Sequence, residues 1–159
     1  MSGQVRLSGE SLANSQGSPD DVLLLAGQVV VTSPVSSVGY QRVFYAGQLV
    51  LPRVSEAVLA SALSGSGQVA WYDGQPRFFL GKDVLGRGFF ELLEEPIALA
   101  VVGSLRIDDD VPPELLRAKV SDITLVGKLT APRRLLPVLQ LVTTERYGTL
   151  RAAEDDDTD

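Results

Sequence analysis

The chain contains no cysteine and no histidine among its 159 residues. Without cysteine it can form no disulfide and offers no thiolate nucleophile. Without histidine it lacks the base of most catalytic triads and a common zinc ligand. We therefore expect no metal site and no cofactor. These absences favour a non-catalytic role, although they do not decide whether the chain is an enzyme.

Basic clusters and long apolar runs are also scarce. The chain has 14 Lys and Arg against 20 Asp and Glu, a net charge of -6, and its longest basic run is Arg133-Arg134. Nucleic acids and anionic membrane surfaces attract clustered positive charge, so we expect neither as a partner. The opening MSGQVRLSGE lacks the apolar core of a signal peptide, and no apolar run approaches a membrane span. We expect a cytoplasmic protein.

A glycine-centred phrase recurs along the chain: glycine, a small or polar residue, then Val or Leu. It begins at Gly3, Gly27, Gly47, Gly67, Gly103, Gly127 and Gly148, with spacings of 24, 20, 20, 36, 24 and 21 residues. Such a period is typical of repeat architectures. Gly27 aligns with Gly103, Gly47 with Gly127, and Gly67 with Gly148. The pattern predicts two pseudo-repeated halves in which these six are the structural repeat glycines.

Each glycine lies within an alternating, strand-like pattern, as in residues 43–51, where every second residue is apolar or glycine. We expect the glycines on the inward face, where a returning helix or loop backbone leaves no room for a side chain. The residues that follow them, including Gln28, Gln48 and Gln68, fall on the outward face. We expect these side chains to stack as a polar ladder across adjacent strands.

Short helices are predicted between the strands, at residues 55–63 and 111–120. A strand and a short helix within one period predict a β-rich α/β solenoid. It would have about six to seven short, mostly parallel strands in two pseudo-repeated halves with short flanking helices. The predicted divisions are a polar N-terminal segment or cap (1–21), a single repeat domain (22–150) and a disordered acidic tail (151–159). Within the repeat domain, 22–72 is the first half, 73–97 a hairpin and helix insertion, and 98–150 the second half.

The predicted units between Val22 and Leu150 resemble leucine-rich-repeat-like and β-solenoid proteins in architecture. The LxxLxLxxN consensus is absent, so the resemblance implies a fold and carries no functional residues. Bactofilin-type β-helical polymers are a weaker comparison, because their turns are almost purely strand.

The stretch WYDGQPRFFLGKDVLGRGFFELLEEP, residues 71–96, is the most aromatic part of the chain. Asp73-Gly74 predicts a hairpin turn. The aromatic residues form either a hydrophobic plug that joins the two halves or an exposed surface for a partner. The candidate interaction surface consists of Trp71, Tyr72, Arg77, Phe78, Phe79, Gln28, Gln48 and Gln68.

Asp108, Asp109 and Asp110 form a compact carboxylate cluster before a predicted helix. Capping of backbone amides is the favoured interpretation, and cation binding or acid/base chemistry are the alternatives.

Taken together, the sequence predicts a non-catalytic scaffold or protein-interaction module that self-associates through solenoid ends or a sheet face. Its partner would be another protein or a second copy, which leaves a homo-oligomer open. The alternative is a small enzyme or ligand-binding protein whose site lies between the aromatic insertion and Asp108–Asp110, with Tyr72, Arg77 and Lys82 converging there.

Overall fold

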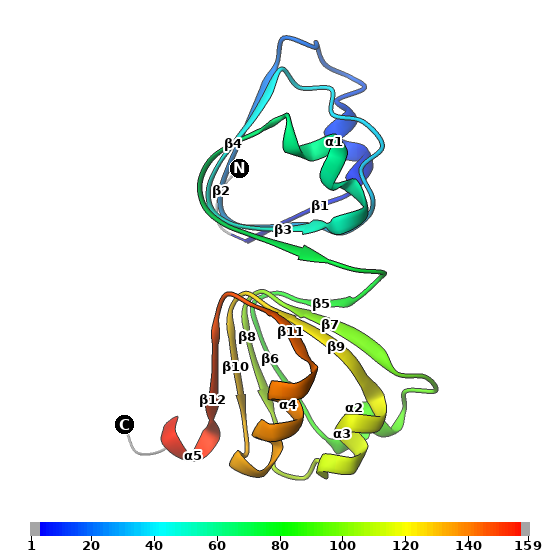
Figure 1. The fold of residues 1–159 in the computed structure, drawn as a ribbon, viewed down its shortest axis with the longest axis vertical. Coiled ribbons are helices and arrows are strands. Elements are labelled where there is room, and N and C mark those ends of the chain that lie inside the picture. Colours follow the sequence, from blue (N-terminus) through cyan, green and yellow to red (C-terminus); the bar gives the residue numbers. More distant parts are fainter. Residues whose placement is uncertain (1–3, 157–159) are drawn as a thin grey trace. The chain divides into compact units, whose positions relative to one another are not determined.

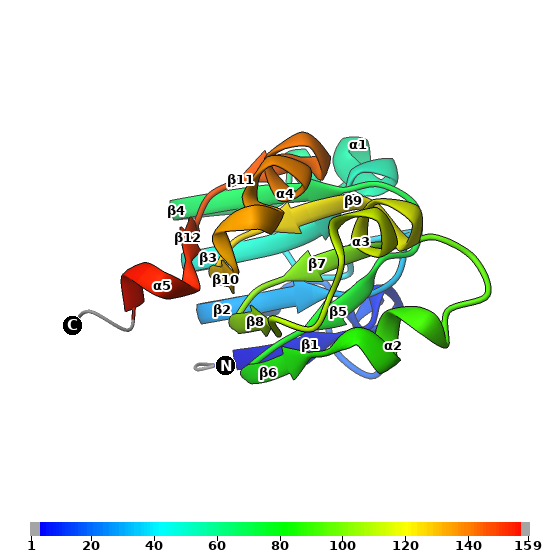
Figure 2. The same cartoon turned by 90° about the horizontal axis from the view of Figure 1, so that it is seen from below.

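The computed structural model describes residues 4–156. The chain divides into two compact units, residues 1–75 and 76–159. The first unit is built on one four-stranded parallel sheet whose strands lie side by side in the order β1-β2-β3-β4 (Figure 2). Its elements are β1 (Gln4–Leu7), the 3-10 helix η1 (Gly9–Ala13), β2 (Val22–Val31), β3 (Arg42–Pro52), the 3-10 helix η2 (Arg53–Ser55), α1 (Glu56–Ala60) and β4 (Leu63–Tyr72).

The long strands of the first unit change direction at a row of glycines. Gly27 pairs with Gly47, and Gly47 pairs with Gly67. Their φ angles are 88°, 119° and 136°, which side chains rarely tolerate. A Cβ atom at Gly47 would lie closer than 3.0 Å to the carbonyl oxygen of Gly27. The expected obstacle was a returning helix or loop, and the structure corrects this: the backbone of the neighbouring strand excludes the side chain.

The core of the first unit follows the alternation of its strands. Val29 and Leu49 are buried on the inner face, together with Leu12 of η1 and Leu59 of α1. Figure 1 shows the bent sheet with α1 on its inner side. The short helices therefore complete a core that a single sheet face leaves open.

The second unit contains two four-stranded parallel sheets. One has the order β11-β9-β7-β5, with β5 (Arg77–Phe79), β7 (Ile97–Val101), β9 (Val120–Leu125) and β11 (Thr143–Arg146). The other has the order β12-β10-β8-β6, with β6 (Lys82–Leu85), β8 (Ser104–Ile107), β10 (Lys128–Ala131) and β12 (Thr149–Ala152). The helical segments are α2 (Arg87–Glu91), α3 (Pro113–Lys119), the 3-10 helix η3 (Arg133–Leu135), α4 (Leu136–Val142) and α5 (Ala153–Asp156).

The two sheets of this unit meet at a glycine corner, and α2, α3 and α4 lie across the remaining side (Figure 1). Phe90, Leu116 and Leu139 of these helices are fully buried with residues from both sheets, such as Leu105 and Ile123. The predicted helix at 111–120 is confirmed as α3, with Pro113 in its first turn. The predicted helix at 55–63 is shorter, because α1 ends at Ala60 and β4 begins at Leu63.

The predicted fold class is wrong. Over residues 4–156, the structure has twelve strands in three four-stranded parallel sheets with five short α-helices, and not one solenoid of six or seven strands. The strand number was too low for two reasons. Each predicted strand around Gly103, Gly127 and Gly148 is two strands separated by that glycine and the residue before it. Further strands lie in the segments assigned to the N-terminal cap and to the insertion.

The insertion prediction for residues 73–97 also needs correction. This segment contains β5, β6 and α2, and Gly81 lies between the two strands in the position that Gly103 occupies before β8. The predicted hairpin is wrong, because β5 pairs in parallel with β7. Asp73-Gly74 instead links two different sheets, with Gly74 at a φ of 65°.

Both predicted terminal segments contain regular structure. The N-terminal segment 1–21 includes β1 and η1, and Leu12 is buried. The tail predicted to be disordered from residue 151 instead contains the end of β12 and α5, with Ala152 and Ala153 buried. Residues 1–3 and 157–159 lie outside the described residues.

Candidate functional site

A ladder of glutamine side chains crosses the sheet of the first unit. Gln4, Gln28, Gln48 and Gln68 occupy the same register on β1, β2, β3 and β4. The Nε2 of each donates to the Oε1 of the next, at 2.8, 2.7 and 2.9 Å. The predicted amide ladder at Gln28, Gln48 and Gln68 is confirmed, and Gln4, which follows the first glycine of the recurring phrase, extends it.

The ladder has a direction and two unfilled ends. Every amide donates toward β4, so Gln68 receives a bond from Gln48 and presents its own Nε2 at the edge. Gln4 donates to Gln28 and presents its Oε1 at the opposite edge. Within residues 4–156, no further hydrogen bond is made by either terminal amide, and both residues are exposed. A donor is thus available at one edge and an acceptor at the other.

Strand β4 forms one edge of this sheet. In the strand order described for residues 4–156 it pairs with β3 alone. Its ten residues, LSGSGQVAWY, include no charge and no proline, and Gly65 through Gln68 are exposed. An edge strand carries unpaired backbone groups, and charge or proline normally protects it from pairing with another chain. The edge of β4 has neither protection.

The aromatic candidates are divided between the two units. Trp71 packs against the core of the first unit and is partly buried. Tyr72 is 3% exposed, and its hydroxyl donates to the carbonyl of Val31 at 2.7 Å. Burial raises the pKa of Tyr72 to about 12. Trp71 therefore belongs to the core of the first unit, and Tyr72 is held to the same unit by its hydrogen bond to Val31.

The remaining aromatic candidates belong to the second unit. Phe79 packs against the core of that unit and meets Phe89 edge to face, with ring centroids 6.2 Å apart. Phe78 is partly buried. Arg77 is exposed, with its guanidinium 5.4 Å from the Phe89 ring centroid. The predicted partner surface on the aromatic residues is thus corrected: Tyr72 is buried, and Trp71, Phe78 and Phe79 are partly buried against their own units.

Asp108 and Asp110 bind backbone amides. The Oδ1 of Asp110 accepts from Arg87 N at 3.0 Å at the start of α2, and the Oδ1 of Asp108 accepts from Asp109 N at 2.9 Å. The carboxylates do bind backbone amides, but not those of the helix that follows them, as was predicted. Helix α3 has Pro112 at its N-cap without a side-chain hydrogen bond, and Asp110 caps α2 instead. Over residues 4–156, no group of three or more acidic side chains is arranged to hold a metal ion.

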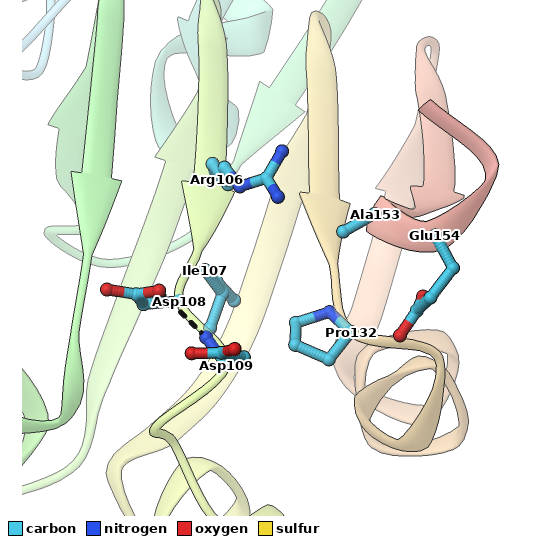
Figure 3. Close-up of a pocket in the computed structure, with 7 residues that line it drawn as sticks. All are labelled: Arg106, Ile107, Asp108, Asp109, Pro132, Ala153 and Glu154. Carbon is cyan, nitrogen blue, oxygen red and sulfur yellow. Dashed lines mark hydrogen bonds between the residues drawn. The ribbon is translucent and has the colours of Figure 1, made fainter. Parts of the chain in front are cut away.

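A polar hollow of about 230 Å³ lies near the ends of β8, β10 and β12 (Figure 3). Its charged lining residues are Arg106, Asp108, Asp109 and Glu154. Glu154 is engaged there, since both carboxylate oxygens accept from Arg133 N, at 3.2 and 3.0 Å. None of Tyr72, Arg77 and Lys82 lines this hollow, so the convergence required by the enzyme or ligand-binding alternative is not found there.

Strand pairing also gathers residues that no sequence run connects. Lys82 and Lys128 both pair with Ser104, and Arg106 and Arg151 both pair with Thr130. These four basic residues share the outward parity of the β6-β8-β10-β12 sheet, opposite to the buried Leu105 and Leu129. Sequence reasoning missed this basic face because its members are 22–24 residues apart. Gly81-Lys82 matches only the first two positions of the phrase at Gly127-Lys128, since Asp83 stands where the phrase has Val or Leu.

None of the helices described between residues 4 and 156 is long and apolar enough to cross a membrane. No family model, curated protein or solved structure matches this chain. The architectural resemblance to leucine-rich-repeat-like proteins therefore remains a prediction.

Proposed function

We propose that this chain is a non-catalytic protein-interaction module that self-associates through the open edges of its sheets. The observation that carries the proposal is β4, a ten-residue edge strand without charge or proline. Strand addition to an exposed edge is a common mode of recognition in which main-chain hydrogen bonds supply the affinity.

The other edge strands support the choice of β4. Each carries at least one charged residue: Arg6 in β1, Arg77 in β5, Lys82 and Asp83 in β6, Glu145 and Arg146 in β11, and Arg151 in β12. These strands are three or four residues long. Short length and charge make these edges poor sites for pairing with a copy of themselves. Among the strands described for residues 4–156, β4 is therefore the best template for an added strand.

The expected affinity is modest. A strand paired with half of β4 forms about five hydrogen bonds, each contributing ~1 kcal/mol net. Association itself costs ~4–15 kcal/mol, so apolar burial must supply the difference. We expect dissociation constants in the micromolar to millimolar range.

Sedimentation velocity over a wide concentration series tests the proposal. The sedimentation coefficient should rise with concentration. Ser66→Lys, on the exposed face of β4, should suppress this rise, because a lysine on an edge strand opposes pairing. Ala46→Lys is the matched control, since Ala46 is exposed in the same register on the central strand β3. A parent protein that stays monomeric at every concentration would refute self-association.

A further inference from the structure

We infer that the strand added to β4 is β1 of a second copy of this chain, in parallel and with Gln4 opposite Gln68. This inference rests on the proposed function and specifies its partner, polarity and register. Three observations carry it: the pairing already present between β1 and β2, the open ends of the core, and the direction of the amide ladder.

The first observation is that β1 already pairs with a strand of the same pattern. Its residues QVRL lie opposite QVVV of β2, in the register Gln4↔Gln28 through Leu7↔Val31. Strand β4 carries QVAW at residues 68–71, in register with the equivalent residues of β2 and β3. The second side of β1 is an edge in the described strand order. Pairing that side with β4 repeats a contact that the fold already makes.

The second observation is that the apolar core is incompletely covered at both ends. In the central strands, the inward residues Val29, Val31, Leu49 and Leu51 are 0–2% exposed. Their counterparts at the edges, Val5 and Leu7 in β1 and Val69 and Trp71 in β4, are only partly buried. The inferred register places Val5 on Val69 and Leu7 on Trp71. Each edge would therefore cover the open end of the other core.

The third observation is the polarity of the ladder. Gln68 presents a donor at β4 and Gln4 presents an acceptor at β1. A head-to-tail contact joins donor to acceptor and continues the ladder from one copy into the next. A symmetric contact between two β4 edges would be antiparallel and would bring two donors together. The head-to-tail contact is heterologous, so it propagates into open chains unless a rotation closes a ring.

Two substitutions test this contact while preserving the ladder within one copy. Gln68→Glu retains the oxygen that accepts from Gln48 and removes the donor at the edge. Gln4→Lys retains a donor to Gln28 and removes the acceptor at the edge. Each variant alone should associate roughly tenfold more weakly than the parent, since one intermolecular hydrogen bond is lost. Circular dichroism and thermal melting of each variant should match the parent.

An equimolar mixture of the two variants is the decisive sample. In an alternating chain, one contact joins the carboxylate of the Gln68→Glu copy to the ammonium of the Gln4→Lys copy as an ion pair, and the next joins the original Gln68 to Gln4. Association should return to at least the parent level, and the gain should decrease with added salt. A parent that associates while the mixture stays as weak as the single variants overturns the head-to-tail register and leaves self-association intact. A parent that never associates overturns both proposals.

Discussion

Replacing Gly47 with alanine probes the feature on which the first unit is built. The backbone at Gly47 has a φ of 119°, and an added Cβ would meet the Gly27 carbonyl oxygen at less than 3.0 Å. Holding a non-glycine residue in such a conformation costs ~1–3 kcal/mol. Relief of the clash requires β2 and β3 to separate locally, which weakens one or two hydrogen bonds at ~1 kcal/mol each. We expect a total loss of about 2–5 kcal/mol in the free energy of unfolding.

The measurement is thermal and urea-induced unfolding followed by circular dichroism. For a chain of this length, ~1 kcal/mol shifts the melting temperature by about 2–4 °C, so Gly47→Ala should melt about 4–20 °C below the parent. Alanine variants at two other glycines distinguish the cost of backbone strain from the cost of the steric clash of the added Cβ. Gly74 has a φ of 65° with no atom within 4 Å of an added Cβ, and Gly88, in α2, has an unobstructed Cβ and no unusual φ.

The expected order of damage is Gly47→Ala, then Gly74→Ala, then Gly88→Ala. The Gly74 variant should lose only the strain energy, about 1–2 kcal/mol. The Gly88 variant should be neutral or slightly stabilised, because alanine favours a helix more than glycine does. If Gly47→Ala melted within one or two degrees of the parent, the argument from strand proximity would be refuted.

Three further perturbations address other contacts. Tyr72→Phe should lower stability by about 1–3 kcal/mol, because it leaves a buried carbonyl unpaired. Folding raises the pKa of Tyr72 to about 12, from an unfolded value near ~10. Its contribution to the free energy of unfolding is therefore full below the unfolded pKa and is lost as the pH rises through 12. Urea titrations at alkaline pH should show this loss in the parent and not in the variant. Gln28→Glu removes an internal ladder donor and should cost about 1 kcal/mol by urea unfolding, whereas Gln68→Glu should cost nothing in the monomer; equal losses would contradict the ladder polarity. Asp110→Ala removes the amide cap of α2 and should cost about 0.5–2 kcal/mol in thermal unfolding, whereas Asp109→Ala should be near neutral; the opposite order would reject the capping role.

Part of the fold could be predicted because it depends on local pattern. The helix at 113–119 is evident from its prolines and its apolar spacing. The glutamine ladder follows from glycine spacing and strand alternation, because equal offsets place equivalent residues side by side in a parallel sheet. The strand count failed where a strand is only three or four residues long, as in RFF of β5 or QVRL of β1, because so short a stretch of alternation does not distinguish a strand from a loop.

The candidate site was predicted less well than the fold. Gln28, Gln48 and Gln68 were identified as an outward ladder, but the importance of β4 as an edge was not, since strand order is a property of the whole sheet. The aromatic surface was misjudged because exposure depends on packing. Trp71 and Tyr72 alternate like any strand residues, and nothing local indicates that the Tyr72 hydroxyl reaches Val31, 41 residues earlier.

The sequence by itself determined where the chain bends and which side chains can stack, because glycine spacing and alternation are local properties of the backbone. The tertiary structure decided which residues pack against those positions. It set the carbonyl of Gly27 against Gly47, divided the aromatic stretch between two cores, and brought four basic residues from distant segments onto one sheet face. It also left β4 at an uncharged edge with an amide donor exposed, because strand order fixes which backbone groups and side chains remain unpaired.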